Sequence, residues 1–569
     1  SPALAGMLLK PHHGDTPRDR LTRFIDRVFG GVFARFNRFF DKLSDRYVGT
    51  VRRAVRASGI VGLLYAGFLG LTWLGFHQVP AGFVPMQDKY YLLSIAQLPA
   101  GASLDRTEAV VQQMSETALA EPGVESVVAF PGLDVNGAAN LPNSAVMFIM
   151  LDSFEDRKGA DLSAHAIAGR LMGKFSQIPD GFVGVFPPPP VPGLGAMGGF
   201  KLQIEDRAGL GFNALAQAQG QIMARAMQTP ELAGMLASFQ PNAPQVQIDV
   251  DRVKAKAQGV PLTAIFETMQ VNLGSLYVND FNRFGRTYRV MVQADAPFRQ
   301  QAENIGQLQV RNATGEMIPL SSLVTITRST GPDRVMHYNG YPSADISGGP
   351  APGYSSGQAT AAIERIVQET LPPGMTYEWT DLTYQEKAAG NTALIVFPLS
   401  VLLAFLILAA QYNSWSLPFA VLLIAPMALL SAIGGVWISG GDNNIFTQIA
   451  FVVLVGLAAK NAILIVEFAR AKEQEGMEPL PAVLEAAKLR LRPILMTSIA
   501  FIAGVIPLVI ASGAGAEMRH AMGIAVFAGM LGVTLFGLIL TPVFYVAVRR
   551  FAVRREARQP SAPLSEQNA

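Results

Sequence analysis

The stretch Phe446–Phe468, FTQIAFVVLVGLAAKNAILIVEF, decides the fold, because it is apolar over more than the roughly 20 residues that a helix needs to cross a bilayer. Other apolar runs lie near Ile60–Phe76, Thr392–Ala410, Pro418–Ile438, Pro493–Ile510 and Ala521–Val548. All but the run at Ile60 are long enough to cross alone, and that run gains length from its flanks. The sequence therefore predicts a polytopic α-helical membrane protein with six spans in this chain.

The composition agrees with a membrane protein. Of 569 residues, 50% are hydrophobic and 15% are charged, and the mean hydropathy is +0.28, whereas a soluble domain carries about 25% charge. Lys plus Arg number 45 and Asp plus Glu 43, a net charge of +2 that gives no reason to expect a nucleic-acid partner. The chain has no cysteine, which excludes disulfides and cysteine-ligated metals.

Basic residues predict the orientation, since cytoplasmic loops near span ends carry an excess of Lys and Arg. The segments 1–59, 471–492 and 549–569 are basic, whereas the loops 440–444 and 512–520 are nearly free of Lys and Arg. We therefore expect both ends of the chain inside and about 310 residues, 80–389, on the far side of the membrane.

The first 59 residues do not contain a complete span. The opening run SPALAGMLL is too short to cross and is interpreted as the end of a preceding span. Apolar residues recur at helical spacing between Leu21 and Leu43, with Arg and Asp between them, which predicts an amphipathic helix on the inner surface. A spacer joining two halves of a transporter is the expected role, and a calmodulin-type target helix is the alternative.

The far-side region alternates strand-like and helix-like segments. YLLSIAQL, Leu104–Ala120, VESVVAF, AVMFIMLD, Leu162–Phe175 and GFVGVF give the order βαββαβ. After a Pro/Gly linker the order restarts with FKLQIE, the helix Asn213–Gln228, LASFQP and VQIDVD. An insertion follows, and MHYNG, SADISGG, the helix Gly357–Thr370 and MTYEWT complete the second unit. We expect an α+β region of two ferredoxin-like subdomains with one insertion.

Lys460 is the residue that most needs an explanation. It lies about 14 residues, or roughly 21 Å, from Phe446, and a charge at that depth costs at least about 2.5 kcal/mol unless it is paired or hydrated. Glu467 is better explained as a boundary pair with Arg470, so the spans offer no partner. A proton or ion relay with a carboxylate elsewhere is the functional hypothesis, and a snorkelling lysine or structural ion pair is the alternative.

Arg490 and Thr497 lie two turns apart on one face of the next span. Arg490 is a candidate relay residue or a membrane anchor, and Thr497 is a candidate relay residue or a donor to its own backbone. The only P-loop near miss, GRLMGKF at Gly169–Phe175, lacks the spacing that ATP hydrolysis needs. No catalytic or metal-ligand pattern stands out, so no enzyme activity is expected.

Several long motifs identify a family. GLAAKNAILIVEFAR, RLRPILMTSIAFIAGVIPLVIASGAGAEMRHAMG, FVPMQDKYYLLSIAQLPAGAS, SLYVNDFNRFGR, AAQYNSWSLPFAVLLIAP and the start SPALAGMLLKP resemble the C-terminal half of a resistance-nodulation-division (RND) multidrug efflux permease. Within the hydrophobe/amphiphile efflux branch, the sequence is most similar to the MexF and OqxB type. The resemblance runs from end to end.

The resemblance implies the following division of the chain. Residues 1–59 are the end of a preceding span and a cytoplasmic amphipathic linker helix, 60–79 a transmembrane span, 80–193 the first porter subdomain, 194–237 and 332–380 the second porter subdomain, 238–331 a docking insertion, 381–548 five spans, and 549–569 a basic cytoplasmic tail.

The resemblance also implies the activity and the partners. It implies a Gram-negative inner-membrane homotrimer with a periplasmic large domain, a secondary active drug/proton antiporter with no cofactor and no metal. A periplasmic membrane-fusion adaptor and an outer-membrane channel protein would complete the pump, and small amphiphilic drugs would be its substrates. Lys460, Arg490 and Thr497 match the proton relay, whose two aspartates belong to the N-terminal half of the same protein.

Four residues match the family's substrate region. Phe148 lies where a pocket phenylalanine is expected, while Phe186, Leu93 and Phe130 are weaker matches. The stretch Phe130–Asn143 would be a switch loop between the access and deep pockets, although it lacks the phenylalanine-rich character of some relatives. For Phe148, the alternative is a core residue of a strand.

Other functions share this fold. A metal-ion exporter would have Met pairs on the pocket face and extra carboxylates in the spans, whereas here the 21 Met are dispersed and the spans are poor in acids. A lipid or hydrophobic-signal exporter, and a non-transporting receptor or secretion-assisting relative, are the remaining alternatives.

Overall fold

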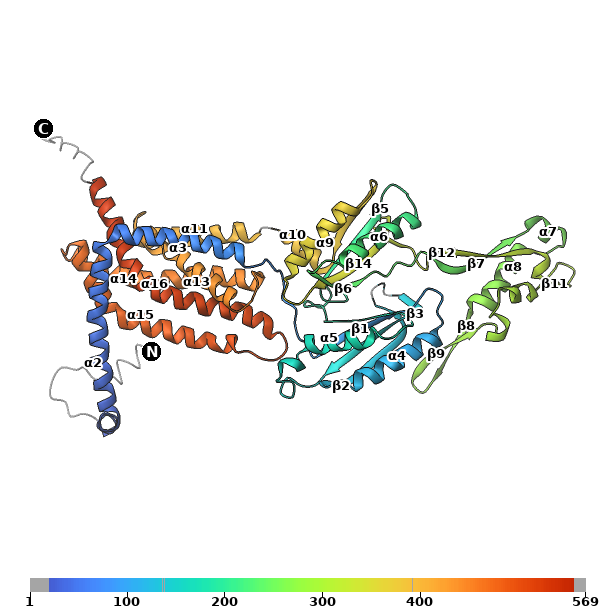
Figure 1. Cartoon of the computed structure of the whole chain (residues 1–569), viewed down its shortest axis with the longest axis horizontal. Coiled ribbons are helices and arrows are strands. Elements are labelled where there is room, and N and C mark those ends of the chain that lie inside the picture. The colour runs from blue at the N-terminus through green and yellow to red at the C-terminus, as the bar shows by residue number, and fades with distance from the viewer. Residues whose placement is uncertain (1–19, 136, 138, 391, 557–569) are drawn as a thin grey trace, which may run out of the picture. The chain divides into compact units, whose positions relative to one another are not determined.

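The computed structural model describes residues 20–135, 137, 139–390 and 392–556 (Figure 1). Two compact units divide the chain: the membrane unit, up to Pro85 and from Ala389 onward, and the sheet unit, Met86–Ala388. The run SPALAGMLL and the tail beyond residue 556, both assigned a role above, lie outside the described residues.

The membrane unit is helical. Its helices are α2 (Arg20–Arg56), α3 (Ser58–Gln78), α11 (Thr392–Tyr412), α12 (Leu417–Leu422), α13 (Ala425–Ile438), α14 (Ile445–Gln474), α15 (Pro479–Val509) and α16 (Ala516–Glu556). In the described part of the chain, six segments are long and apolar enough to cross a membrane: Ser58–Gln78, Ile395–Tyr412, Leu417–Ile438, Ile445–Gln474, Pro479–Val509 and Ala516–Arg550. The six predicted spans are therefore confirmed.

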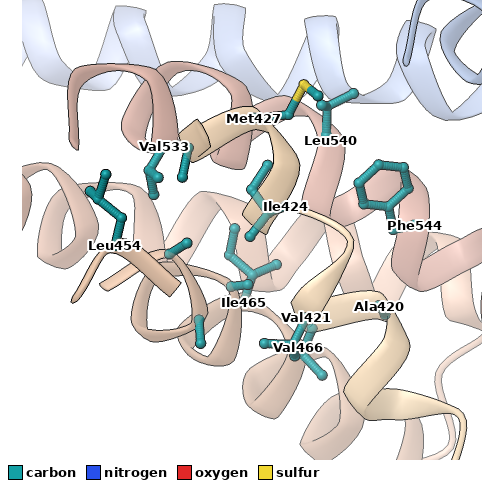
Figure 2. Close-up of a cluster of buried hydrophobic side chains, with 14 of the residues drawn as sticks. Ala420, Val421, Ile424, Met427, Leu454, Ile465, Val466, Val533, Leu540 and Phe544 are labelled. Carbon is teal, nitrogen blue, oxygen red and sulfur yellow. The ribbon is translucent and has the colours of Figure 1, made fainter. Parts of the chain in front are cut away.

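Small residues allow the spanning helices to approach closely. A Cβ added at Gly529 of α16 would overlap Leu454 of α14, and one added at Gly435 of α13 would overlap Ala528 of α16. Such contacts stabilise helix pairs where lipid removes the hydrophobic driving force. Figure 2 shows the buried apolar side chains that fill the space between these helices, among them Ile465 and Val533.

The predicted amphipathic helix is confirmed as a helix and is longer than expected, since α2 extends to Arg56. Its C-terminal half packs on the spans: Tyr47 donates a hydrogen bond to the carbonyl of Leu538 at 2.8 Å, and Asp45 pairs with Lys488 at 2.9 Å. These contacts fix α2 to α15 and α16.

The first sheet of the sheet unit has the strand order β2-β3-β1-β4. Its elements follow the predicted βαββαβ order: β1 (Tyr91–Gln97), α4 (Leu104–Leu119), β2 (Val124–Asp134), β3 (Ala139–Leu151), α5 (Ala164–Phe175) and β4 (Phe182–Phe186). The second helix begins later than predicted, because a 3-10 turn occupies Ala160–Leu162 and the Ser163 side chain caps α5. Side chains of both helices pack in one apolar core with one face of this sheet.

The second sheet has the order β13-β14-β5-β15, with β6 also pairing to β14. Its elements are β5 (Phe200–Asp206), α6 (Phe212–Ala226), β6 (Leu232–Leu236), β13 (Met336–Tyr338), β14 (Tyr341–Pro350), α9 (Ser356–Thr370) and β15 (Met375–Thr380), followed by α10 (Asp381–Ala389). The side chains of α6 and α9 share a core with this sheet.

Two strand predictions for the second sheet are wrong. The strand predicted at LASFQP instead covers Leu232–Leu236, because the pairing with β14 ends at Leu236 opposite Ser347. VQIDVD is a strand, β7 (Ala243–Val250), but it pairs with β12 (Val324–Gly331) and not with the second sheet. Strand propensity was read correctly, and the partner was not, because alternation does not encode which strand lies opposite.

The insertion has a small apolar core of its own. Besides β7 and β12 it contains α7 (Arg252–Ala257), α8 (Leu262–Met269), a π-helical turn at Gln270–Gly274, the hairpin β8 (Leu276–Arg283) and β9 (Arg286–Val292), 3-10 turns at Ala296–Phe298, Ala302–Gln307 and Leu320–Ser322, and the pair β10 (Gln309–Arg311) and β11 (Met317–Pro319). The subdomain boundaries assigned from the resemblance stay predictions.

Candidate functional site

Three of the four predicted substrate residues form one row across the first sheet. Leu93 of β1 is paired with Phe148 of β3 on one side and with Phe186 of β4 on the other. Because side chains of paired residues point to the same face of a sheet, the three side chains lie together. Their shared apolar cluster is separate from the core beneath α4 and α5, so they occupy the face that these helices leave uncovered.

Phe130 of β2 joins this row at its edge. Its ring meets the Phe148 ring edge to face, with centroids 6.1 Å apart, a favourable aromatic arrangement. Phe130 is 44% exposed and Phe148 is half-buried, whereas Leu93 and Phe186 are 2% and 5% exposed. The structure thus brings all four residues together, with an open aromatic edge and a covered centre.

The second sheet covers the centre of the row. Leu236 of β6 packs in the same cluster as Leu93 and Phe186. Gly234, at a positive φ of 61°, lies so close that an added Cβ would be 3.2 Å from the Phe186 ring. Beside Phe186 a small hollow, partly open to solvent, is lined by Met197, Phe200, Ser347 and their neighbours.

The Pro-rich linker between the sheets is held by Lys89. Its Nζ donates hydrogen bonds to the carbonyls of Pro189 at 2.9 Å and Pro190 at 2.7 Å. Burial lowers the pKa of Lys89 from its usual 10.5, because desolvation disfavours the charged form. The linker therefore has a fixed start near the first sheet.

Lys460 lies in the middle of α14. It is 14 residues before the end of the helix at Gln474, about 21 Å. Its side chain is exposed on the surface of the chain, in a stripe with Val453, Gly456 and Glu467. Within the described parts of the chain, no hydrogen bond or ion pair reaches Lys460. The role predicted for Lys460 stays a prediction.

Charged residues nearer the end of α14 are paired. Lys472 lies 3.3 Å from Glu485 of α15, and Glu473 lies 2.8 Å from Arg549 of α16. The predicted pair of Glu467 with Arg470 is not among the ion pairs of the described residues, because the Arg470 guanidinium lies over the Tyr412 ring at 5.8 Å. Ion pairs thus join α14 to its neighbours near the end of the helix, whereas Lys460 lies in the middle of the helix.

A hydrogen bond that was not predicted from the sequence shows which residues of α14 and α15 lie side by side. Asn461 Nδ2 donates to Ser498 Oγ at 3.1 Å, with both residues buried. Lys460 and Thr497 directly precede these two residues, so they lie at nearly the same level on neighbouring helices. The available sequence signal was small polar residues directly beside the two candidates, in otherwise apolar spans.

Thr497 and Arg490 do not contact Lys460 in the described structure. Thr497 Oγ1 donates to the carbonyl of Ile494 at 3.1 Å, the backbone alternative anticipated from sequence. The Arg490 guanidinium lies 3.3 Å from the centroid of the Phe468 ring, a cation–π contact two turns along α14 from Lys460. Among the described residues, none forms a hydrogen bond with its buried Nε. The relay assignment of these three residues stays a prediction.

The chain was compared with known proteins. The model of the AcrB/AcrD/AcrF family matches residues 1–549. The chain belongs to this family. Among described residues, no group of three His, Asp or Glu side chains is arranged to hold a metal ion.

Individual relatives of this AcrB/AcrD/AcrF family chain are named as efflux proteins. It is 39% identical over 557 residues to the multidrug export protein AcrF of Escherichia coli K12, which covers 97% of this chain and 52% of that protein. It is 38% identical over 571 residues to the multidrug/solvent efflux pump membrane transporter MepB of Pseudomonas putida, covering 99% and 53%. It is 37% identical over 560 residues to the multidrug resistance protein MdtF of Escherichia coli K12, covering 97% and 53%. The chain thus spans about half the length of the curated relatives it matches.

Proposed function

We propose that this chain is the C-terminal half of an inner-membrane, proton-driven transporter that exports amphiphilic drugs. The observation that carries the proposal is Lys460, a charged side chain near the middle of α14 that no described acid or hydrogen-bond acceptor reaches. A charge at that depth costs at least about 2.5 to 3.5 kcal/mol unless a partner or a wet cavity receives it. The fold therefore calls for an acidic partner on another segment.

The N-terminal half of the same protein would supply that partner as two aspartates facing the exposed stripe of α14. While the aspartates are ionised, they hold Lys460 by ion pairing. Protonating them removes that attraction, so Lys460 turns toward the Thr497 level of α15. The helices then have two arrangements whose populations depend on proton binding.

Substrates would reach the face of Leu93, Phe148, Phe186 and Phe130. Its apolar and aromatic side chains suit amphiphilic molecules of varied shape, because such contacts are weakly directional. The names of the relatives, which refer to multidrug export and solvent efflux, support this substrate class.

The sheet unit would be periplasmic, as the excess of Lys and Arg at the opposite ends of the spans indicates. In this orientation a homotrimer would collect drugs from the periplasm or the outer leaflet. It would pass them to a periplasmic adaptor and an outer-membrane channel protein.

The test is drug accumulation in an efflux-deficient Gram-negative host that expresses the full-length protein. Lys460→Ala should raise accumulation to the level of the empty host, because coupling to protons is lost. Lys488→Ala is the matched control, since this lysine and its partner Asp45 are both more than half exposed, so that their pair contributes little and the variant should export like the parent. Both variants are compared at equal membrane abundance. Export by Lys460→Ala equal to that of the parent would contradict the relay, and no export by the parent would contradict drug transport.

A further inference from the structure

A series of buried polar side chains joins the predicted switch loop to the second sheet. Asp134, the last residue of β2, forms an ion pair with Arg334, which lies between β12 and β13. The side chains are 7% and 14% exposed, respectively. The pair therefore links segments 200 residues apart in sequence, in a place that water barely reaches.

Arg334 also holds the second sheet. Its Nη2 donates to Ser238 Oγ at 2.7 Å, and Ser238 Oγ donates in turn to a carboxylate oxygen of Asp345 on β14. Ser238 and Asp345 are 9% and 7% exposed. One guanidinium thus lies between a carboxylate of the first sheet and, through a hydroxyl, a carboxylate of the second.

The loop after β2 is shaped to receive the guanidinium. A Cβ added at Gly137 would overlap Nη1 of Arg334 and lie 2.7 Å from a carboxylate oxygen of Asp134. A side chain at this position would therefore displace the ion pair.

The contact lies beside the covered substrate face. Ser238 follows Leu236 by two residues, and Leu236 is the second-sheet side chain that covers Leu93 and Phe186. Ser238 and Arg334 also lie where the chain leaves the second sheet after β6 and returns before β13. A displacement of Leu236 from the face would therefore also displace Ser238, which Arg334 links to Asp134.

We propose that Asp134, Arg334, Ser238 and Asp345 form a latch that holds the second sheet over the substrate face and must break for that face to open. This inference rests on the proposed function only for the idea that opening the face admits substrates. Arg334 is a positioning residue, since it acts on access to the face and not on a bound molecule.

The physics of buried ion pairs gives the latch a distinctive response to mutation. Removing one partner leaves the other charge buried and uncompensated, which favours a state in which that charge reaches water. Removing both charges of the Asp134–Arg334 pair leaves Asp345 with the Ser238 hydroxyl that already donates to it, so an apolar and amide pair of similar size restores closure.

The opening can be measured by pulsed electron paramagnetic resonance on the full-length protein. This chain has no cysteine, so spin labels can be placed at Gln113→Cys on α4 and Ala361→Cys on α9, both exposed. Any cysteine outside this chain is replaced. The distance distribution between the labels then reports on the separation of the two sheets.

The expected results differ between single and double variants. Arg334→Ala and Asp134→Asn should each raise the ratio of long to short distances by about tenfold or more. The double variant Asp134→Asn/Arg334→Met should return toward the parent distribution. Arg328→Ala is the matched control, because this arginine is 81% exposed beside Glu303 and should leave the distances unchanged.

Parent-like distances in both single variants would overturn the latch, as would a double variant more open than either single one. Gly137→Ala gives a second measurement that removes no charge, and it should also lengthen the distances. The distance readout does not depend on drug export. A shift in a protein that exports nothing therefore supports the latch and overturns only the proposed function.

Discussion

In the first sheet, four strands and two helices follow one another along the chain from Tyr91 to Phe186. In the second sheet, the insertion separates β6 from β13. The two arrangements are also stabilised differently. In the first sheet, ion pairs with a buried charged side chain join neighbouring elements. In the second sheet, carboxylates pair with a neighbouring arginine or accept hydrogen bonds from backbone N–H groups. The comparison teaches that similar orders of elements do not require similar polar contacts.

Apart from the Asp134–Arg334 pair, which joins it to the second sheet, the described segment of the first sheet has two ionic contacts with a nearly fully buried side chain. Arg157, with a side chain 1% exposed, pairs with Asp88 at 2.9 Å, and Glu121, also 1% exposed, pairs with Arg170 at 2.5 Å and Lys174 at 2.6 Å. The second sheet instead has Glu205 of β5 and Glu378 of β15, which both pair with Arg207 directly after β5. Arg207 and Glu378 are substantially exposed. Losing an ionic contact should therefore matter more in the first.

The largest expected effect is that of Arg157→Ala. The guanidinium donates to both carboxylate oxygens of Asp88 and to the carbonyls of Asp152 and Leu162. Removing it should lower the local free energy of unfolding by about 3 to 5 kcal/mol. Hydrogen exchange of the α5 amides in the purified protein measures this loss. Arg157→Lys keeps the charge but not the two-pronged guanidinium, so its exchange rates should lie between those of the parent and of Arg157→Ala. Exchange rates unchanged in both variants would contradict the comparison of the two sheets.

Glu121→Gln should have an intermediate effect that depends on pH. Burial raises the pKa of Glu121, but hydrogen bonds and charges from Lys174 and Arg170 lower it by more, to below its usual 4.5. The ionised form is therefore favoured by folding, and its contribution is complete above about pH 4.5 and lost as pH falls through the folded pKa.

At neutral pH we expect Glu121→Gln to lower the free energy of unfolding by about 1 to 3 kcal/mol. Exchange of α4 and α5 amides across a pH series should show parent and variant converging in acid. A gap that widens as pH falls would contradict the assigned pKa direction.

Asp206→Ala should have the smallest of the three effects and act on the second sheet. Its carboxylate accepts the N–H groups of Leu210 at 3.0 Å and Gly211 at 2.8 Å, just where α6 begins without a side-chain cap. Burial raises the pKa of Asp206, and these backbone hydrogen bonds lower it below its usual 3.8. We expect Asp206→Ala to lower the local free energy of unfolding by about 1 to 2 kcal/mol.

The readout for Asp206→Ala is faster exchange confined to the first turn of α6. Ser355→Ala is the matched control, because Ser355 caps α9 in the same unit through a capping box and should affect only α9. Faster exchange throughout the second sheet would mean that Asp206 supports the sheet and not the helix start.

The sequence predicted these features to different depths. Apolar length gave all six spans, and alternation gave β1, β3, β5 and β14, since both patterns are local. The row of Leu93, Phe148 and Phe186 was expected only through the family resemblance, and the pairing of β7 with β12 was not predicted at all.

By itself the sequence determined the membrane class, the βαββαβ order of the first sheet and its two helices, and the anomaly of a lysine in the middle of an apolar helix. Each depends on a residue and its near neighbours along the chain. Only the tertiary structure decided that Asn461 meets Ser498 and that Asp134 meets Arg334. Those contacts join segments brought together by packing, and no local pattern records which distant side chain will be opposite.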